Sequence, residues 1–295
     1  MRGKIVFAGL ILALTGVGAA AQNAPRVPTA DDIYCPGMVS SENVPRDTYL
    51  ITGEGSDTKV TFQEGDYVYI NKGSSQGVKV GDEFSVIRSV FNWTETDWWQ
   101  WESRILSKLG TVWEDEGRVR VVVTQSNVSI AQIEHSCSYM QRGDIVQRFI
   151  PRPAPPLKEN GHFDRFAPPS GKPAAMVIAT KGFHAEVGNG DSIYVNLGAT
   201  QGVKVGDYFR IFRYNGTQHE RAYQTRRFAF NADGDDIIYF RQYGYGSVPL
   251  SYKWDNVPRE VLGEGIVTRT TPNSSTVLVT YTLRECYTGD YVEVE

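Results

Sequence analysis

The sequence predicts a mainly β protein: two homologous, small β-barrel-like domains with short helical insertions, joined by a proline-rich linker. Three features support this prediction: a repeated block of sequence, a composition with 29 glycines and many β-favouring residues, and a cluster of prolines between the two copies. The repeat is the strongest of the three, because a segment that occurs twice indicates one structural unit used twice.

The repeat has two blocks in each copy. Residues 65–88 read GDYVYINKGSSQGVKVGDEFSVIR, and residues 190–213, displaced by 125 positions, read GDSIYVNLGATQGVKVGDYFRIFR. A later block, residues 117–146, matches residues 263–292 at a displacement of 146 positions. The larger displacement indicates that the second copy carries the longer insertion between its two blocks.

Each copy holds three Gly-Asp pairs, and alternating hydrophobic residues follow them. Glycine supplies the positive φ of a tight turn, and an Asp carboxylate accepts hydrogen bonds from backbone amides two residues on. We therefore interpret these carboxylates as turn residues rather than catalytic groups or metal ligands, and expect Val68, Ile70, Phe84 and Val86 in the core. The pairs are Gly65-Asp66, Gly81-Asp82, Gly143-Asp144, Gly190-Asp191, Gly206-Asp207 and Gly289-Asp290.

Prolines mark the boundary between the predicted domains. Half of the 14 prolines lie within residues 151–173, and proline cannot donate the backbone hydrogen bonds of a sheet. We therefore predict a first barrel domain at residues 31–150, a linker at 151–173 and a second barrel domain at 174–295.

The first 21 residues have the pattern of a secretory signal peptide. Arg2 and Lys4 precede an apolar stretch, residues 5–18, that is too short to span a bilayer, and three alanines end at residue 21. The sequence therefore predicts an exported protein without a transmembrane anchor. Cleavage removes two basic and no acidic residues, which changes the formal net charge from −4 to −6. Because no basic run is present, nucleic acid is not an expected partner.

The three cysteines permit one disulfide in an exported protein. Cys35 and Cys137 both lie in the first half, so we predict a bridge between them, with Cα atoms roughly 4.4–6.8 Å apart. Cys286 is then expected to pack as a small hydrophobic residue. Three buried free thiols are the alternative.

The two insertions differ in sequence. In the first, residues 94–97 provide a helix start, apolar residues follow at helical spacing, and Gly110 provides a stop. The apolar residues are Trp98, Trp101, Ile105 and Leu109. In the second, residues 217–230 are expected to be helical and residues 239–254 to form a loop or hairpin.

One segment of the second insertion resembles the opening of a calcium-binding loop. It reads NADGDD, from Asn231 to Asp236. In a calcium loop the glycine comes later and a glutamate closes the site. Gly234 comes too early and no glutamate follows at the right distance, so we interpret the segment as a solvated turn and expect no metal ligands.

The sequence carries no recognisable catalytic motif. The four histidines lack the paired spacing of a zinc site, and no nucleophile elbow, phosphate loop or Cys-His nucleophile pattern occurs. We therefore expect no enzyme activity and no cofactor. The best functional candidates are aromatic residues of the insertions, which are typical of partner- or sugar-binding surfaces when exposed. They are Trp98, Trp99, Trp101, Tyr243, Tyr245 and Trp254. The alternative is that the tryptophans cover one end of a barrel as part of its core.

The motif shared by both copies resembles a domain of known bacterial proteins. It is an aromatic residue, a hydrophobic residue, Asn-x-Gly and then Gln-Gly-Val-Lys-Val-Gly-Asp-x-Phe, followed later by Gly-Asp-x-Val. This pattern resembles the C-terminal domain of the flagellar assembly protein FlgT and domains downstream of LysM modules in exported bacterial proteins. The resemblance implies a non-enzymatic envelope domain that packs against other envelope components or peptidoglycan.

The resulting functional hypothesis is a non-catalytic, exported binding or scaffold protein with a protein or peptidoglycan partner. Its expected location is the periplasm or the extracellular side or cell envelope of a bacterium. The alternative is a secreted carbohydrate-binding or carbohydrate-active protein that uses the tryptophan-rich insertion, with a carboxylate pair that the sequence does not identify. The sequence leaves the oligomeric state open.

Overall fold

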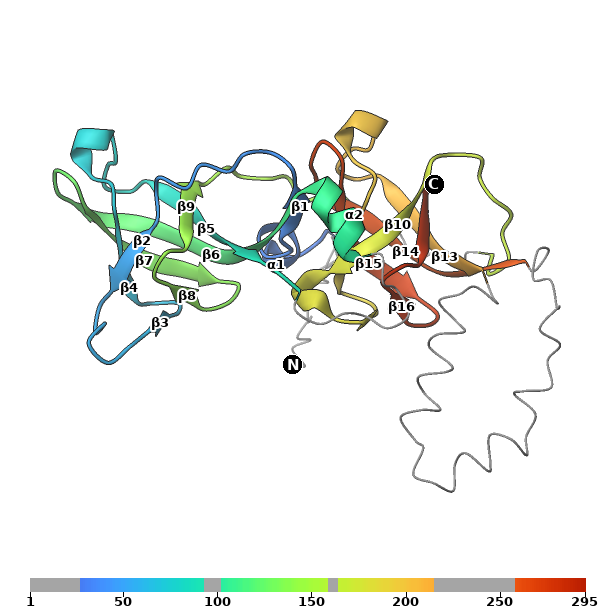
Figure 1. The fold of residues 1–295 in the computed structure, drawn as a ribbon, viewed down its shortest axis with the longest axis horizontal. Helices are drawn as coiled ribbons and strands as arrows, with labels where there is room; N and C mark the ends of the chain where they lie inside the picture. The colour runs from blue at the N-terminus through green and yellow to red at the C-terminus, as the bar shows by residue number, and fades with distance from the viewer. Residues whose placement is uncertain (1–26, 93–101, 159–163, 215–257) are drawn as a thin grey trace, which may run out of the picture.

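The computed structural model describes residues 27–92, 102–158, 164–214 and 258–295 and is mainly β (Figure 1). Its helices are α1 (Ala30–Tyr34) and α2 (Glu102–Leu109), with 3₁₀ turns η1 (Ser74–Gln76), η2 (Lys181–Phe183) and η3 (Ala199–Gln201). The predicted signal peptide and the expected helix at residues 217–230 lie outside the described residues. No helix in the described segments has the length and apolar character needed to cross a membrane.

The first unit of the structure is a seven-stranded sheet with strand order β2-β4-β7-β6-β5-β9, in which β1 also pairs with β6. Backbone hydrogen bonds from Leu50 to Asp144 and from Gly143 to Leu50 bring the edge strands β2 and β9 together. A small sheet of β3 and β8 lies beside it. The strands are β1 (Met38–Ser40), β2 (Leu50–Gly53), β3 (Thr61–Phe62), β4 (Tyr67–Ile70), β5 (Glu83–Val90), β6 (Thr111–Thr124), β7 (Ser129–Ser136), β8 (Met140–Gln141) and β9 (Ile145–Arg148).

The second unit is a closed barrel with strand order β10-β12-β15-β14-β13-β17, beside a small sheet of β11 and β16. Five strands of this order, β12, β15, β14, β13 and β17, overlap the repeat blocks, in the same sequence of segments as β4, β7, β6, β5 and β9 of the first unit. The strands are β10 (Ala174–Thr180), β11 (Glu186–Val187), β12 (Ser192–Val195), β13 (Tyr208–Tyr214), β14 (Arg259–Thr270), β15 (Ser275–Thr282), β16 (Cys286–Tyr287) and β17 (Tyr291–Val294).

Each unit has its own hydrophobic core. In the first unit, the four predicted core residues Val68, Ile70, Phe84 and Val86 are all buried and belong to one cluster. The alternating pattern of the strands therefore predicted correctly which side chains face inward.

The Gly-Asp pairs all form the same turn. The six glycines have φ between 86° and 95°, the left-handed region that favours glycine. Each Asp carboxylate accepts a hydrogen bond from the backbone amide three residues earlier, at 2.7–3.0 Å. The turn interpretation agrees with this geometry, except that the bonded amide precedes the aspartate rather than following it.

Two of these aspartates also bind a partly buried arginine. Arg88 bonds both carboxylate oxygens of Asp144, at 2.7 and 2.8 Å, and Arg213 bonds both oxygens of Asp290, at 2.6 and 2.7 Å. A planar guanidinium matches a carboxylate in this two-point geometry. Each arginine therefore ties β5 or β13 to the turn before β9 or β17.

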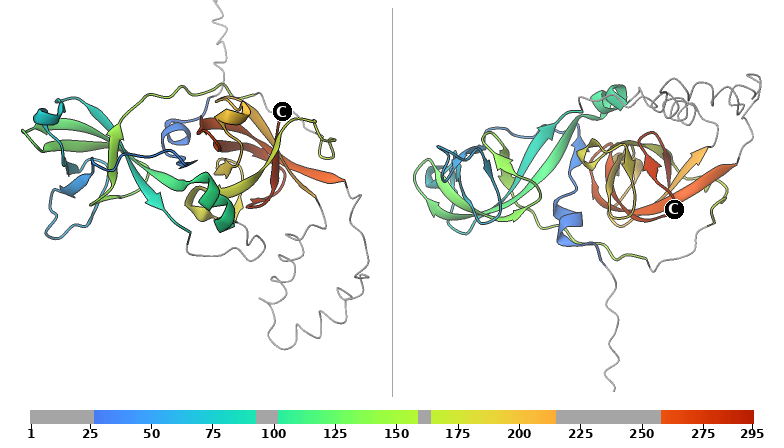
Figure 2. Two further views of the ribbon diagram at one scale, coloured as in Figure 1. Left: turned by 45° about the horizontal axis from the view of Figure 1, so that its top comes forward. Right: turned by 90° about the horizontal axis from the view of Figure 1, so that it is seen from below.

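The two units meet along a short chain segment, residues 36–39, which lies between them (Figure 2). The Tyr194 hydroxyl donates to the Pro36 carbonyl at 2.7 Å, and Thr276 donates to the Gly37 carbonyl at 3.0 Å. Thr271 and Ser274 both donate to the Val39 carbonyl, at 3.0 and 2.5 Å. Hydroxyl groups of the second unit thus satisfy the carbonyl groups of Pro36, Gly37 and Val39, at the N-terminal edge of the first unit.

Apolar contacts accompany these bonds. Val39 and Val112 of the first unit form one buried cluster with Ile178, Ala179 and Tyr194 of the second. Partly buried apolar side chains of α2 pack on this cluster: Ile105, Leu106 and Leu109. The predicted helix is thus present from residue 102 to residue 109, and its first residues lie outside the described part.

The proline-rich segment packs along the second unit where it is described. The Arg259 Nε donates to the Ala167 carbonyl at 2.8 Å, and the Lys158 amide donates to the Tyr208 hydroxyl at 2.6 Å. Leu157 packs beside Tyr208 and Leu278. These contacts attach both described parts of the segment to the barrel.

The turn geometry predicts a contrast between two neighbouring glycines. Gly190→Ala should lower the free energy of unfolding by about 1–2 kcal/mol, because alanine is strained at φ +89°. Gly188 lies outside that φ range, and an added Cβ would come no closer than 4.0 Å to Thr282. Gly188→Ala should therefore cost less than about 0.5 kcal/mol. Urea unfolding of the two variants measures the difference, and equal stabilities would contradict the turn argument.

The junction predicts a second contrast, between two tyrosines at matching repeat positions. Tyr194→Phe should cost about 1–3 kcal/mol, because it removes the donor to the buried Pro36 carbonyl. Tyr69, the matching residue of the first unit, is only partly buried, so Tyr69→Phe should change stability by less than about 0.5 kcal/mol. Thermal unfolding of both variants tests this; a larger loss for Tyr69→Phe would show that the junction bond is unimportant.

Candidate functional site

A cleft of about 540 Å³ lies between the two units. The first unit contributes α1, β6 and the residues that follow β7, and the second contributes η2, β11 and the turn before β12. A smaller cavity of about 160 Å³ shares Asp32 and Gly190 with the cleft and continues it toward Tyr208 and Glu264. Burial raises the pKa of the Glu264 carboxyl.

Carboxylates line the cleft from both sides. They are Asp31, Asp32, Glu114, Asp115 and Asp191, and they face the basic side chains Lys181 and His184. The excess of negative charge gives the cleft a potential that favours cationic ligands.

Most of these carboxylates already have structural partners. Asp32 closes a capping box with Thr29 at the start of α1, and Asp191 accepts from the Gly188 amide in its turn. Asp31 lies 3.0 Å from the His135 Nε2. Glu114, on β6, is partly exposed at the cleft wall.

Asp115 connects the cleft to the junction of the units. Its carboxylate accepts from the Gly37 amide at 2.9 Å and lies 3.4 Å from the Arg269 guanidinium of the second unit. Arg152 is close by, and its pKa is lowered to about 10, mainly by burial and also by the neighbouring Arg269. A buried carboxylate thus balances two arginines where the units meet.

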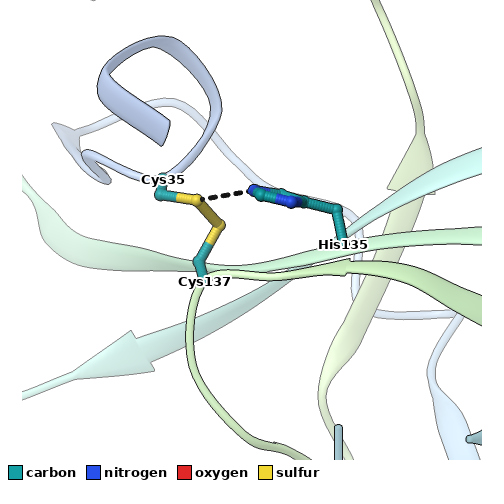
Figure 3. Close-up of side chains that lie close together, drawn as sticks. All are labelled: Cys35, His135 and Cys137. Atoms are coloured by element: carbon teal, nitrogen blue, oxygen red, sulfur yellow. Dashed lines mark hydrogen bonds between the residues drawn. A yellow bond between two sulfur atoms is a disulfide. The ribbon is translucent and has the colours of Figure 1, made fainter. Parts of the chain in front are cut away.

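The cleft wall also contains the disulfide (Figure 3). Cys35 and Cys137 are bonded, with Cα atoms 5.2 Å apart, so the predicted bridge is confirmed and the alternative of three free thiols is wrong. The bridge joins the end of α1 to the residue after β7. Cys286 is a free thiol in the core of the second unit, and burial raises its pKa.

His135 belongs to the same cluster. Its Nε2 lies 3.3 Å from the Cys35 Sγ and 3.0 Å from a carboxylate oxygen of Asp31. The scattered spacing of the four histidines did not predict this. The sequence pattern that could have predicted it is His135-x-Cys137, because residues two apart in a strand lie on the same face.

Glu116 is a second residue that the sequence analysis missed. Its side chain is 0% exposed, and the Arg88 Nη1 lies 3.2 Å from it. Burial raises the pKa of the Glu116 carboxyl to about 8, although Arg88 acts in the opposite direction. When the two copies are aligned at the displacement of 146 positions, Glu116 corresponds to Leu262 and Asp115 corresponds to Val261. A comparison of the two copies in the sequence could therefore have identified both carboxylates, because each stands where the second copy has an apolar residue.

The aromatic partner-binding candidates lie outside the described residues. These are Trp98, Trp99, Trp101, Tyr243, Tyr245 and Trp254, and the segment from Asn231 to Asp236 lies outside as well. The cleft between the units is therefore the candidate site that the structure adds to those predicted from the sequence.

No model of a known protein family matches the chain, and no curated protein matches it in sequence.

The raised pKa of Glu116 predicts a pH-dependent stability. Because the folded protein holds this proton more tightly than the unfolded chain, the contribution of Glu116 is full below about pH 4.5 and is lost as the pH rises through about 8. Glu116→Leu, which installs the residue of the second unit, should remove this loss and raise stability at pH 8 by about 1–4 kcal/mol. Unfolding free energies from pH 5 to pH 9 measure it.

The reciprocal substitution serves as the control. Leu262→Glu places a carboxylate in the core of the second unit and should destabilise the protein at pH 8. An unchanged pH profile in Glu116→Leu would contradict the assignment of this dependence to Glu116.

Proposed function

We propose that the protein is a non-catalytic binding or scaffold protein, exported to the bacterial cell envelope, that holds a partner in the cleft between its two β units. The observation that carries this proposal is the junction: hydroxyl groups of the second unit bond carbonyl groups of residues 36–39, and a shared apolar cluster surrounds them. A junction of this kind fixes the distance and orientation of the two cleft walls.

The hydrogen bonds and ion pairs of the cleft carboxylates favour a role in binding over a role in catalysis. Asp32 and Asp191 hold backbone amides, and Asp115 balances arginines at the junction. These contacts fix the position of the carboxylates that give the cleft its negative surface. A surface of this kind favours association through complementary charge.

The charge of the cleft favours a basic polypeptide segment of another envelope protein as the partner. Glu114 and the exposed Asp31 would face lysine or arginine side chains of that segment. Peptidoglycan is the second proposed class of partner. This proposal is based on the resemblance of the repeat to the FlgT C-terminal domain and to LysM-associated domains.

Export is supported by the signal-peptide pattern and by the disulfide. Disulfides persist in oxidising compartments such as the bacterial periplasm, and the Cys35–Cys137 bridge joins segments 102 residues apart in sequence. These two observations support a proposed location in the periplasm or at the cell surface.

We further propose that the two units are copies of one ancestral module. The argument rests on matching interactions at matching repeat positions. Arg88–Asp144 corresponds to Arg213–Asp290, and both copies use Gly-Asp turns with the same hydrogen bond. The equal strand order of the two units supports the same conclusion.

The aromatic residues of the insertions are proposed as a second contact surface for the partner. Trp98, Trp99 and Trp101 directly precede α2 in sequence, and α2 packs at the junction of the units. Tyr243, Tyr245 and Trp254 belong to the longer insertion of the second unit.

Binding of defined peptides tests the cleft. A lysine-rich fluorescent peptide should bind the wild-type protein, and Glu114→Lys should weaken binding at least about tenfold by like-charge repulsion. Asp57→Lys, which makes the same charge change at an exposed position of the first unit away from the cleft lining, should leave binding within about twofold. Equal weakening by both variants would show a general charge effect and contradict a cleft site.

A pull-down from an envelope fraction identifies the partner and tests the aromatic surface. Wild type and Trp99→Ala are compared, with co-sedimentation on purified peptidoglycan as the second arm. Recovery of the same partners in equal amounts by both proteins would contradict a contact surface formed by the tryptophans. Turnover of a glycan by the purified protein would overturn the non-catalytic assignment in favour of a carbohydrate-active protein.

A further inference from the structure

Four side chains with metal-ligand chemistry meet at the cleft wall. Cys35, His135 and Cys137 offer ligand atoms that all lie within 4.8 Å of one another. Asp31 adds a carboxylate oxygen 3.0 Å from the His135 Nε2. Figure 3 shows the imidazole ring directed at the sulfur of Cys35.

The local secondary structure explains why these four groups converge. Asp31 and Cys35 are four residues apart across α1, whose last turn closes with the Cys35 amide bonded to the Asp31 carbonyl, so both lie on one side of the helix. His135 and Cys137 are two residues apart at the end of β7, so both lie on one face of the chain. Each element thus contributes a pair of ligands.

The spacing suits a four-coordinate zinc ion. Zinc binds thiolate sulfur at about 2.3 Å and imidazole nitrogen at about 2.0–2.1 Å, which places neighbouring ligand atoms about 3.3–3.8 Å apart in a tetrahedron. The separation of 3.3 Å between the Cys35 Sγ and the His135 Nε2 is of this size. The two sulfur atoms reach such a separation only when their bond is broken.

We propose that reduction of the Cys35–Cys137 disulfide converts this cluster into a Zn²⁺ site with Cys35, Cys137, His135 and Asp31 as ligands. A dithiol reductant supplies two electrons and two protons, is itself oxidised to a disulfide, and leaves Cys35 and Cys137 as thiols. Zn²⁺ then displaces the two thiol protons, which pass to solvent, and takes two thiolates, a neutral imidazole and a carboxylate.

The metal would join the same two segments that the disulfide joins. In the oxidised protein a covalent bond connects α1 to the end of β7; in the reduced protein Zn²⁺ connects them through two ligands on each side. Cys137 lines the cleft, so the metal and the reductant reach the cluster from there. The cleft wall would thereby keep its position in both redox states.

The second unit has no such cluster at the corresponding positions. In the repeat register His135 corresponds to Tyr281 and Cys137 to Leu283. The ligand set therefore belongs to the wall of the cleft and not to the shared scaffold.

Titration with Co²⁺, a spectroscopic substitute for Zn²⁺, tests the site on the full mature chain. The protein is reduced with an excess of a phosphine, freed of it under inert gas, and titrated. The reduced protein should show thiolate-to-cobalt charge transfer and the strong visible bands of four-coordinate Co²⁺, and Zn²⁺ should displace one equivalent. The oxidised protein should show neither. Absence of these bands in the reduced protein would overturn the proposal.

Variants assign the ligands. His135→Ala and Asp31→Ala should each weaken Zn²⁺ binding at least about tenfold, and Cys35→Ser should abolish the charge-transfer band typical of two thiolates. The first two variants retain both cysteines, so their oxidised forms can be checked for folding by circular dichroism before reduction.

A matched histidine controls for adventitious binding. His184→Ala removes the other histidine of the cleft and should leave Zn²⁺ affinity within about twofold of wild type. Equal loss in His184→Ala and His135→Ala would overturn the assignment, as would unchanged affinity in His135→Ala.

Discussion

The architecture depends on the hydrogen bonds that the second unit gives to residues 36–39. A buried carbonyl without a partner costs more than the bond itself contributes, so this segment cannot remain between two apolar surfaces unless Tyr194, Thr276 and Ser274 donate to it. Gly37 fits there because its φ is +73° and an added Cβ would lie 2.5 Å from the Tyr194 hydroxyl. The cleft, the position of α1 and the relation of the two units all follow from this contact.

Inside each unit, the Gly-Asp turns are stabilised by hydrogen bonds of their own. A Gly-Asp turn places the glycine where other residues are strained, and its carboxylate holds the amide that begins the turn. Where Arg88 or Arg213 adds a two-point bond, the turn becomes attached to a neighbouring strand. Among the differences between the units are two carboxylates of the first, Asp115 and Glu116, at positions that are apolar in the second, and Asp115 lines the cleft.

Local patterns predicted much of the fold because their causes are local. Alternation identified Val68 and Val86 as core residues, and a shared domain was sufficient to pair Cys35 with Cys137. The cleft could not be predicted in this way. Tyr194 bonds a carbonyl 158 residues earlier, and no spacing in the sequence encodes that distance. The spacing of the histidines gives no sign of His135, whose close neighbours are Asp31 and Cys35, both about 100 residues earlier in the chain.

The place of residues 36–39 in the chain has a consequence for the order of folding. Synthesis begins at the N-terminus, and domains generally fold as they emerge. The carbonyl groups of this segment, however, receive their donors from Tyr194 and from residues 271–276, close to the other end of the chain. A segment that is made early is therefore among the last to be completed, and a nascent chain that lacks its final strands leaves these carbonyl groups without their donors.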